Sequence, residues 1–310
     1  GATRAVYAEL ADLGLAGLAV PETHGGMGFG AIEAMVVCEE LGRGLVNAPY
    51  AEAALMTPAL LAAAPALLQG AWLPRLAAGE ALVVPALQEQ TARYRLHHVG
   101  VHAVAAGESW ALTGVKTMVP AGDEADAYIV PARLRGKPDD ADGIGLFLVE
   151  SGMEGFRRGQ NLAKMGLKAQ DTSELFFDNL KVPKSHVLGD PAQGFRYLTT
   201  YLAEERLLNT CWNIAHAQTA FDITLDYIKE RKAFGRPIGT FQNSRFRMAE
   251  MRAQLDAIQV FVDHCVMEHN AGRLAPEVAA EAKLLSSELE NRVMDECVQL
   301  HGGAGYMQEY

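Results

Sequence analysis

Three short stretches hold the side chains most able to do chemistry. AEERLL places Glu204 and Glu205 side by side, directly before Arg206. A glutamate inside an apolar pocket has a raised pKa and can act as a general base. Acidic residues in the early turns of a helix are also commonplace, because they suit the helix dipole. The residues alone leave both interpretations open.

The stretch RKAFGRPIG, residues 231–239, sets cations and an aromatic residue against a turn. Gly235 and Pro237 enforce the turn, which holds Phe234 beside Arg231. One interpretation is a helix C-terminus whose cations complement the dipole. The other is an anion clamp, in which Arg231 makes charge-assisted hydrogen bonds to a diphosphate.

The stretch QLHGGAGYMQEY, residues 299–310, runs a helical pattern into paired glycines. Without a Cβ, the backbone can approach a ligand closely and its amides can bond ligand oxygens. The alternative is a glycine C-cap followed by a turn.

Other fingerprints of chemistry are absent from the sequence. The nine histidines form no HExxH or similar spacing, so we expect no metal site. GMGFG, residues 26–30, follows PETHG instead of an apolar strand, which indicates a loop and not a dinucleotide fingerprint. The cysteines lie far apart without a CxxC pair, and we expect buried free thiols at Cys38, Cys211, Cys265 and Cys297.

Composition narrows the class of protein further. The chain has 310 residues, 49% of them hydrophobic and 21% charged, which is typical of a globular protein. Its net charge of −11 opposes nucleic-acid binding, which requires a basic surface. No run of about 18 uncharged apolar residues occurs, so we expect no membrane span. The N-terminal residues lack a secretory signal, and we expect a cytoplasmic protein.

The elements that must position these stretches follow from hydrophobic spacing. Residues 5–68 show helical spacing, residues 81–188 show short alternating runs bounded by Gly, Pro or Asp, and helical spacing returns from residue 195. The pattern predicts a mainly α, α+β fold. We expect an N-terminal helical domain (1–80), a central β-barrel-like domain (81–190) and a C-terminal four-helix bundle (191–310).

In order and spacing, several stretches together resemble the acyl-CoA dehydrogenase family over nearly the whole chain. They are PETHGGMGFG, CEELGRGL, the end of the β domain (GLKAQDTSELFFDNLKVPKSHVLG, residues 166–189), AEERLL, RKAFGRPIGTFQNSRFRMAEM and QLHGGAGYMQEY. The resemblance implies FAD-dependent α,β-dehydrogenation of an acyl-CoA thioester to the trans-2-enoyl-CoA, a step of fatty-acid β-oxidation. In the family a glutamate removes the α-proton, and the β-hydrogen leaves as hydride to the flavin N5.

The resemblance also assigns the base. Most family members carry the catalytic glutamate in a C-terminal segment that would lie beyond Tyr310. Long-chain and isovaleryl-type members place it instead immediately before an arginine in the first long helix of the bundle. In this register the base is Glu205, with Arg206 as a substrate contact. This placement of the base hints at long or branched acyl groups.

The cofactor residues follow in the same way. The corner like RKAFG contacts the FAD of the neighbouring protomer, which implies roles for Arg231, Phe234 and Gln242. The QLHGG-like segment touches the diphosphate region of FAD, which implies Gln299, Gly302 and Gly303. A shared FAD site requires a homodimer or homotetramer, and the expected electron acceptor is an electron-transfer flavoprotein.

The sequence also departs from the family pattern. Met118 stands where the family has a flavin-contacting tryptophan, and Pro120 replaces a hydrogen-bonding threonine. Family members start earlier and continue beyond QLHGGAGYMQEY, so the resemblance implies either an incomplete sequence of a longer protein or a truncated C-terminal domain. The altered segments, residues 83–96 and 115–122, favour a catalytically silent partner subunit with a degenerate flavin site. AEERLL, RKAFG and QLHGG favour the enzyme. A flavin oxidase or monooxygenase is a third alternative on this scaffold.

Overall fold

The computed structural model describes residues 2–309, which divide into two compact units. The β unit contains the residues up to 30 together with residues 47–201. The helical unit contains residues 31–46 and the residues from 202 onward. Among the described residues, no helix is both long enough and apolar enough to cross a membrane.

Short helices precede the sheet of the β unit. They are α1 (Ala2–Asp12), η1 (Leu15–Gly17), η2 (Glu22–His24), the π-helical η3 (Ala51–Met56), α3 (Thr57–Leu61) and α4 (Ala66–Ala77). The buried Thr57 hydroxyl donates to the Val83 carbonyl at 2.9 Å, which ties α3 to the first strand. These helices confirm the predicted N-terminal helical region.

The sheet has eight strands, in the order β6-β7-β3-β2-β4-β5-β8, with β1 beside β4. The longest pairing joins β3 to β7 and contains two register shifts, which bend and twist the two strands. The strand bounds are β1 (Val83–Pro85), β2 (His102–Ala106), β3 (Ser109–Pro120), β4 (Ala127–Arg133), β5 (Ile144–Glu150), β6 (Phe156–Asn161), β7 (Thr172–Pro183) and β8 (Val187–Leu188), with η4 (Lys184–His186) between the last two.

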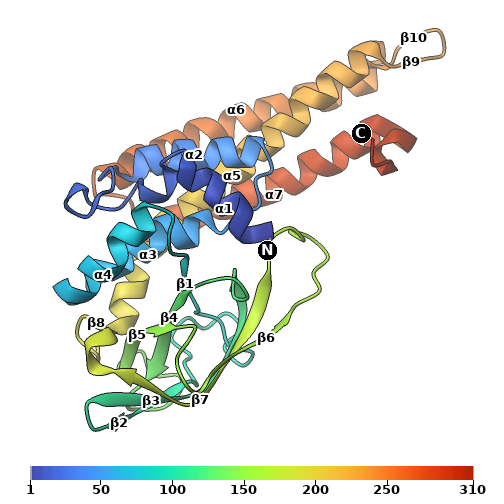
Figure 1. The fold of residues 1–310 in the computed structure, drawn as a ribbon. Coiled ribbons are helices and arrows are strands. Elements are labelled where there is room, and N and C mark those ends of the chain that lie inside the picture. Colours follow the sequence, from blue (N-terminus) through green and yellow to red (C-terminus); the bar gives the residue numbers. More distant parts are fainter. Residues whose placement is uncertain (1, 310) are drawn as a thin grey trace. The chain divides into compact units, whose positions relative to one another are not determined.

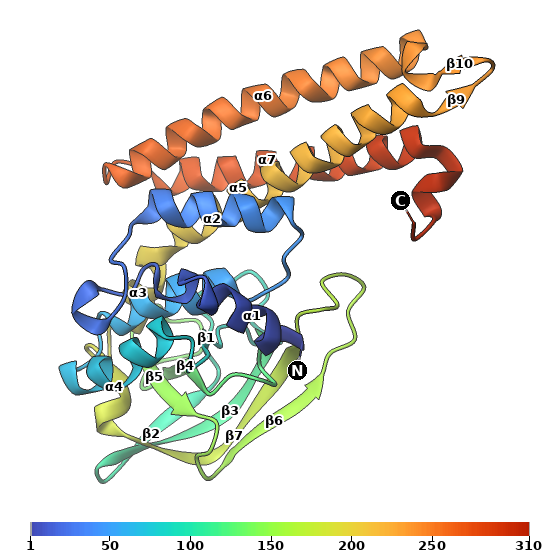
Figure 2. The ribbon, with the colours of Figure 1, turned by 45° about the horizontal axis from the view of Figure 1, so that its top comes forward.

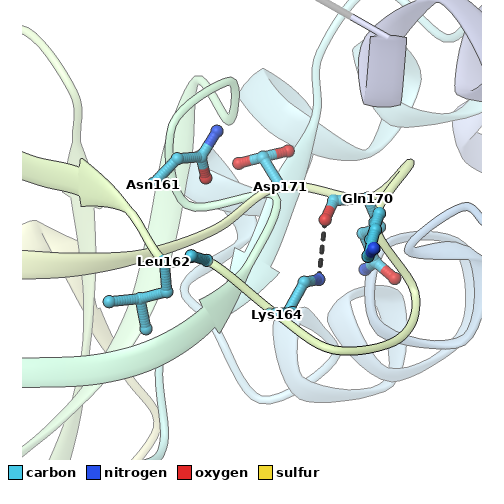
Figure 3. Close-up of a pocket in the computed structure, with 7 residues that line it drawn as sticks. Asn161, Leu162, Lys164, Gln170 and Asp171 are labelled. Atoms are coloured by element: carbon cyan, nitrogen blue, oxygen red, sulfur yellow. Dashed lines mark hydrogen bonds between the residues drawn. The ribbon is translucent and has the colours of Figure 1, made fainter.

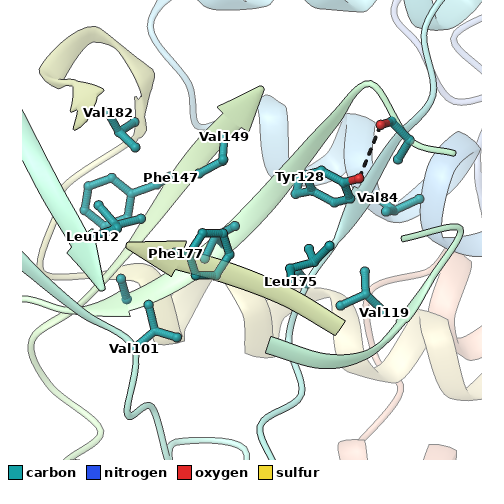
Figure 4. Close-up of a cluster of buried hydrophobic side chains, with 14 of the residues drawn as sticks. Val84, Val101, Leu112, Val119, Tyr128, Phe147, Val149, Leu175, Phe177 and Val182 are labelled. Atoms are coloured by element: carbon teal, nitrogen blue, oxygen red, sulfur yellow. Dashed lines mark hydrogen bonds between the residues drawn. The ribbon is translucent and has the colours of Figure 1, made fainter. Parts of the chain in front are cut away.

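A buried apolar core lies against the sheet. Side chains from β3, β4, β5 and β7 meet there, among them Leu112, Tyr128, Phe147 and Phe177 (Figure 4). The Tyr128 hydroxyl is satisfied inside the core because it donates to the Gly122 carbonyl at 2.7 Å. All of β4 is buried, so its near-continuous apolar sequence reflects a strand covered on both faces. The predicted central β domain is confirmed.

The helical unit contains four α-helices among its described residues. They are α2 (Ala31–Arg43), α5 (Gly194–Glu230), which begins in the β unit, α6 (Gln242–Asn270) and α7 (Pro276–His301). The long helices α5, α6 and α7 run side by side (Figures 1 and 2). Leu255, Ile258, Val262 and Cys265 are buried on one face of α6, which agrees with the helical spacing of this region.

Helix α2 comes from the N-terminal part of the chain, yet it belongs to the helical unit. It approaches α5 so closely that a Cβ on Gly42 would lie 2.5 Å from the Trp212 carbonyl oxygen. Glycine is therefore required at this crossing. The boundaries 1–80, 81–190 and 191–310 remain a prediction, since the compact units group the chain differently.

Three smaller elements complete the helical unit. A hairpin of β9 (Lys232–Ala233) and β10 (Arg236–Pro237) follows α5, and η5 (Ile238–Thr240) leads into α6. A turn, η6 (Gly302–Tyr306), follows α7. Within this unit, the hairpin and the C-terminal turn lie at the same end of the long helices (Figures 1 and 2). All four cysteines are free and buried, as predicted.

Candidate active site

The two adjacent carboxylates of AEERLL have different surroundings. Glu204 Oε2 lies 3.3 Å from Nε2 of His269, near the end of α6. The Glu205 carboxylate has no hydrogen bond or ion pair with any described residue. Arg206, next in the chain, is half-buried, and its guanidinium likewise forms no such bond within residues 2–309. Of the two adjacent glutamates, Glu205 is therefore the one whose carboxylate has no bonded partner among the described residues.

Desolvation by the surrounding protein raises the pKa of the Glu205 carboxyl, although the residue is exposed. The positive charges of Arg206 and Lys283 act in the opposite direction and lower this pKa. A carboxylate with a raised pKa is the stronger base. A general base at this position would need a pKa shifted in this direction.

The hairpin after α5 presents an aromatic ring in a strained conformation. Its two-residue turn is Phe234–Gly235, with φ angles of 52° and 80°. Positive φ at both positions is the pattern of a type I′ turn, which favours Asn-Gly and not a bulky residue. The Phe234 side chain is 95% exposed. Strain at an exposed apolar residue points to a role outside folding.

Neighbouring residues brace this hairpin. The Phe234 ring meets Phe241 edge-on, with 6.2 Å between centroids. The Arg236 guanidinium lies over the Phe241 ring at 4.3 Å from its centroid. The exposed Gln242, the first residue of α6, follows immediately. The turn is therefore held in place without using the exposed face of Phe234.

Arg231 lies at the base of the hairpin. Its backbone N–H donates to the Tyr227 carbonyl at 2.8 Å, and its own carbonyl accepts from Ile238 N–H at 2.8 Å. Its guanidinium is exposed and forms no hydrogen bond or ion pair with the residues described. The backbone is fixed while the cation stays available for an anionic ligand.

The glycine turn after α7 is attached to the end of α5 by two aromatic rings. Tyr227 and His301 stack with centroids 4.2 Å apart and planes 16° apart. Gly302 follows with φ 62° and ψ −134°, a conformation that only glycine adopts readily. Gln299, Gly302 and Gly303 are exposed, and a Cβ at either glycine would have nothing within 4 Å. This open, glycine-only turn lets a ligand approach the backbone.

The structure therefore brings two of the predicted stretches together. Because Tyr227 lies one helical turn before Arg231 and His301 directly precedes Gly302, the stack joins RKAFG to QLHGG. Sequence reasoning missed Tyr227 and His301. The available signal was an aromatic residue one turn before the cationic corner.

The same helix keeps Glu205 away from the end that carries the hairpin and the glycine turn. Twenty-five residues separate Glu205 from the end of α5 at Glu230, and the helix is continuous between them. At a rise of about 1.5 Å per residue, that distance is about 38 Å. Glu205 and Arg231 of one chain therefore lie far apart along the helical unit.

In the β unit, Met118 interrupts strand β3. The pairing of β3 with β7 shifts register between Lys116 and Val119, and Met118 has φ 52°. The side chain is 60% exposed. Pro120, two residues on, lies opposite Thr172 of β7 and has no N–H to donate. Met118, like Phe234, is an exposed apolar residue in a left-handed conformation.

A polar pocket of about 420 Å³ lies at the same end of β7 (Figure 3). Its lining residues are Asn161, Leu162, Ala163, Lys164, Lys168, Gln170 and Asp171. Lys164 Nζ donates to the Gln170 carbonyl at 2.7 Å and to the Thr172 hydroxyl at 2.8 Å. Burial lowers the pKa of Lys164, and the charge of Asp171 opposes this effect. Sequence reasoning missed this pocket.

The loop of this pocket exposes two further apolar residues. Met165 is 99% exposed, and Leu167 is exposed with φ 49°. Ala121 N–H donates to the Asp171 carbonyl at 3.0 Å, which connects the loop to the strand end beyond Met118. The exposed left-handed residues Met118 and Leu167 therefore lie near the same end of strands β3 and β7.

No three His, Cys, Asp or Glu residues come together as a metal site in residues 2–309.

Comparison with known families gives three matches in chain order. The acyl-CoA dehydrogenase N-terminal domain matches residues 1–80, the middle domain matches residues 86–180, and the C-terminal domain matches residues 192–310. Together they cover most of the chain.

Individual relatives agree. The long-chain specific acyl-CoA dehydrogenase of Mus musculus is 37% identical over 99% of this chain and 72% of its own length. A solved acyl-CoA dehydrogenase from Geobacillus kaustophilus has a TM-score of 0.93 at 35% identity, covering 99% of this chain and 82% of that one. Butyryl-CoA dehydrogenase from Megasphaera elsdenii has a TM-score of 0.91 at 28% identity, covering 98% and 81%.

Fold, chain order and sequence thus agree over nearly all of the residues compared. The chain belongs to the acyl-CoA dehydrogenase family of FAD-dependent oxidoreductases.

Proposed function

We propose that this protein dehydrogenates an acyl-CoA thioester to the trans-2-enoyl-CoA, with Glu205 as the base that removes the α-proton. The observation that supports this role best is the contrast between two neighbours. Glu204 is bound to His269, whereas Glu205 has no bonded partner in residues 2–309 and has a raised pKa. A carboxylate that the protein does not bind is available to a substrate.

The residues present fit an FAD. Arg231 offers an uncommitted guanidinium for the diphosphate, and the turn at Gly302 and Gly303 offers close backbone approach. Phe234 and Met118 offer exposed apolar surfaces for a flat ring. Gln242 and Gln299 are exposed near these groups in sequence and supply amide donors.

The chain's own part in the reaction is proton removal and charge control. When bound, FAD supplies the acceptor for the β-hydrogen, which leaves with its electron pair. Glu205 takes the α-proton as the Cα–H bond breaks, so that the double bond forms between Cα and Cβ. The positive charges of Arg206 and Lys283 favour the ionised form of Glu205, which is the form that accepts the proton.

The direct experiment compares Glu205→Gln with Glu204→Gln under anaerobic conditions, using absorbance of bound FAD as the readout. We expect Glu205→Gln to bind FAD and to lose about 10²- to 10⁴-fold in the rate of flavin bleaching by an acyl-CoA. Glu204→Gln keeps a hydrogen-bond acceptor for His269 and should change the rate by less than about fivefold. Equal loss in both variants would contradict the role of Glu205.

The substrate is expected to have a long acyl chain. The mouse relative is named long-chain specific, and the glutamate-arginine pair on the first long helix follows the long-chain and isovaleryl-type pattern. An anaerobic titration with short, long and branched acyl-CoAs tests this. Bleaching by the short chains alone would contradict it.

The proposed acceptor is an electron-transfer flavoprotein. A solved chain 31% identical to this one, with a TM-score of 0.90, comes from a structure titled for the electron transferring flavoprotein of Acidaminococcus fermentans. Reoxidation of the reduced enzyme by a purified electron-transfer flavoprotein tests the proposal. Reoxidation by oxygen at an equal rate would favour an oxidase.

A catalytically silent partner subunit is the second candidate. The substituted residues Met118 and Pro120 favour it, because Pro120 cannot donate a backbone hydrogen bond to a flavin. This candidate predicts a colourless protein that takes up no added FAD. A yellow protein that acyl-CoA bleaches would exclude it.

A further inference from the structure

A buried ion pair lies directly before the Met118 bulge in strand β3. Lys116 has no exposed surface, and its Nζ lies 2.6 Å from Oε1 of Glu89. The Glu89 carboxylate also accepts backbone N–H groups from Gly100 at 2.7 Å and Val101 at 3.2 Å. Both carboxylate oxygens of Glu89 therefore accept hydrogen bonds. The ion pair connects the segment after β1 to strand β3.

The segment that contains Glu89 also holds the bulge around Met118. Thr117 N–H donates to the Gln88 carbonyl at 2.9 Å. The register shift between Lys116 and Val119 removes regular pairing with β7, so Met118 takes a left-handed conformation that methionine rarely adopts. Such a conformation persists only where surrounding structure fixes it. Gln88 and Glu89 supply that constraint.

A contribution to folding stability does not by itself explain why the buried Lys116–Glu89 pair is charged. Burial lowers the pKa of Lys116, while the Glu89 carboxylate raises it, so desolvation works against the ammonium. Replacing a buried ion pair by apolar side chains is often neutral or stabilising. The ion pair connects Glu89 to strand β3 at Lys116, two residues before Met118, by a short and directional contact.

We propose that Lys116 and Glu89 are positioning residues that hold the Met118 bulge against the flavin ring. The inference rests on the proposed function, because it requires that FAD binds this chain. It also explains how the flavin segment, residues 83–96, can differ from the family pattern and still shape the site. A carboxylate within that segment fixes the strand beside the ring.

The test uses apoprotein and added FAD, with three readouts: the FAD dissociation constant from flavin fluorescence, the visible spectrum of bound FAD, and its midpoint potential. The variant is Lys116→Met combined with Glu89→Gln, which removes both charges while the amide oxygen still accepts from Gly100. The control is Val130→Ala in the buried strand β4, which destabilises the same unit away from the bulge. Thermal unfolding is followed for both.

We expect the double variant to bind FAD about tenfold more weakly, the effect of losing roughly one well-placed contact, with an altered spectrum and potential. Val130→Ala should lower the melting temperature and leave all three flavin readouts unchanged. A double variant with wild-type flavin readouts would overturn the positioning role.

A double variant that fails to fold is replaced by Glu89→Asp, which keeps both charges and moves the carboxylate back by one methylene. A shifted spectrum or potential in Glu89→Asp supports the inference, and unchanged flavin readouts overturn it. Wild-type protein that takes up no FAD is a separate outcome. It would overturn the proposed function, and the positioning role with it.

Discussion

At the residue scale, the structure separates two glutamates that the sequence could not. AEERLL offers adjacent carboxylates, and only the packing of α5 against α6 shows that His269 binds Glu204. The identity of His269 could not be predicted, because it lies 65 residues away and in no recognisable motif. The family register had already selected Glu205. The structure adds a physical reason for that choice. Of the two glutamates, only Glu205 has a carboxylate without a bonded partner among the described residues.

The raised pKa of Glu205 predicts the pH dependence of flavin reduction. A base must be deprotonated, so the rate should fall as pH decreases through a pKa above the ordinary value of about 4.3 for glutamate. Lys283→Met removes a charge that lowers this pKa and should move the profile to higher pH. Stopped-flow reduction at several pH values measures both. A profile that Lys283→Met leaves in place would contradict the assignment.

The same shift has a defined sign for stability. Folding raises the pKa of Glu205, so the native state favours its protonated form. The resulting contribution to stability is present below the ordinary glutamate pKa and is lost as pH rises through the folded value. Glu205→Gln should therefore be at least as stable as wild type near neutral pH in denaturant unfolding.

At the element scale, the hairpin and the glycine turn were predictable as turns but not as one assembly. Gly235, Pro237 and paired glycines indicate chain reversals in any sequence. The Tyr227–His301 stack that joins the two segments depends on how α5 and α7 pack, which hydrophobic spacing does not specify. The Met118 bulge was missed for a similar reason, because a left-handed methionine has no sequence signal. The altered residue types at 118 and 120 gave only a hint.

Phe234 should cost stability in exchange for ligand contact. Asn adopts the left-handed conformation far more readily than Phe, so Phe234→Asn should raise the free energy of unfolding of the apoprotein by about 1 kcal/mol. The exposed ring is lost, so FAD should bind more weakly. Denaturant unfolding and FAD titration measure the two effects. Unchanged FAD affinity would show that the ring serves another purpose.

His301 should matter through its stack on Tyr227. His301→Ala removes an aromatic pair and should lower the free energy of unfolding by about 1 kcal/mol. The glycine turn would lose its attachment to α5, so FAD affinity should fall as well. His301→Phe keeps a ring and should restore most of both quantities. A failure of His301→Phe to restore FAD affinity would point to a direct role for the imidazole.

At the scale of the whole molecule, the length of α5 determines how a site can be assembled. The order of helices, β domain and helices was readable from spacing, because period and chain order survive in one sequence. The assignment of α2 to the helical unit was not readable, since nothing local distinguishes it from its neighbours. From the distance of about 38 Å along α5, we propose that Glu205 and Arg231 of one chain serve different flavins.

We therefore propose that each active site combines Glu205 of one chain with Arg231 and Phe234 of a second copy. The most direct test coexpresses Glu205→Gln with Arg231→Glu, two variants that should each be inactive alone. Random pairing gives one intact site in half of the dimers, which cannot arise if each chain builds its own site.

The measurement is acyl-CoA-dependent flavin reduction by the coexpressed protein, with separately purified and mixed variants as the control. Two-chain sites predict about a quarter of wild-type activity, because half of the dimers are hybrids and each hybrid has one intact site. Activity no greater than the sum of the two inactive parents, in protein shown to contain hybrids, would contradict the account.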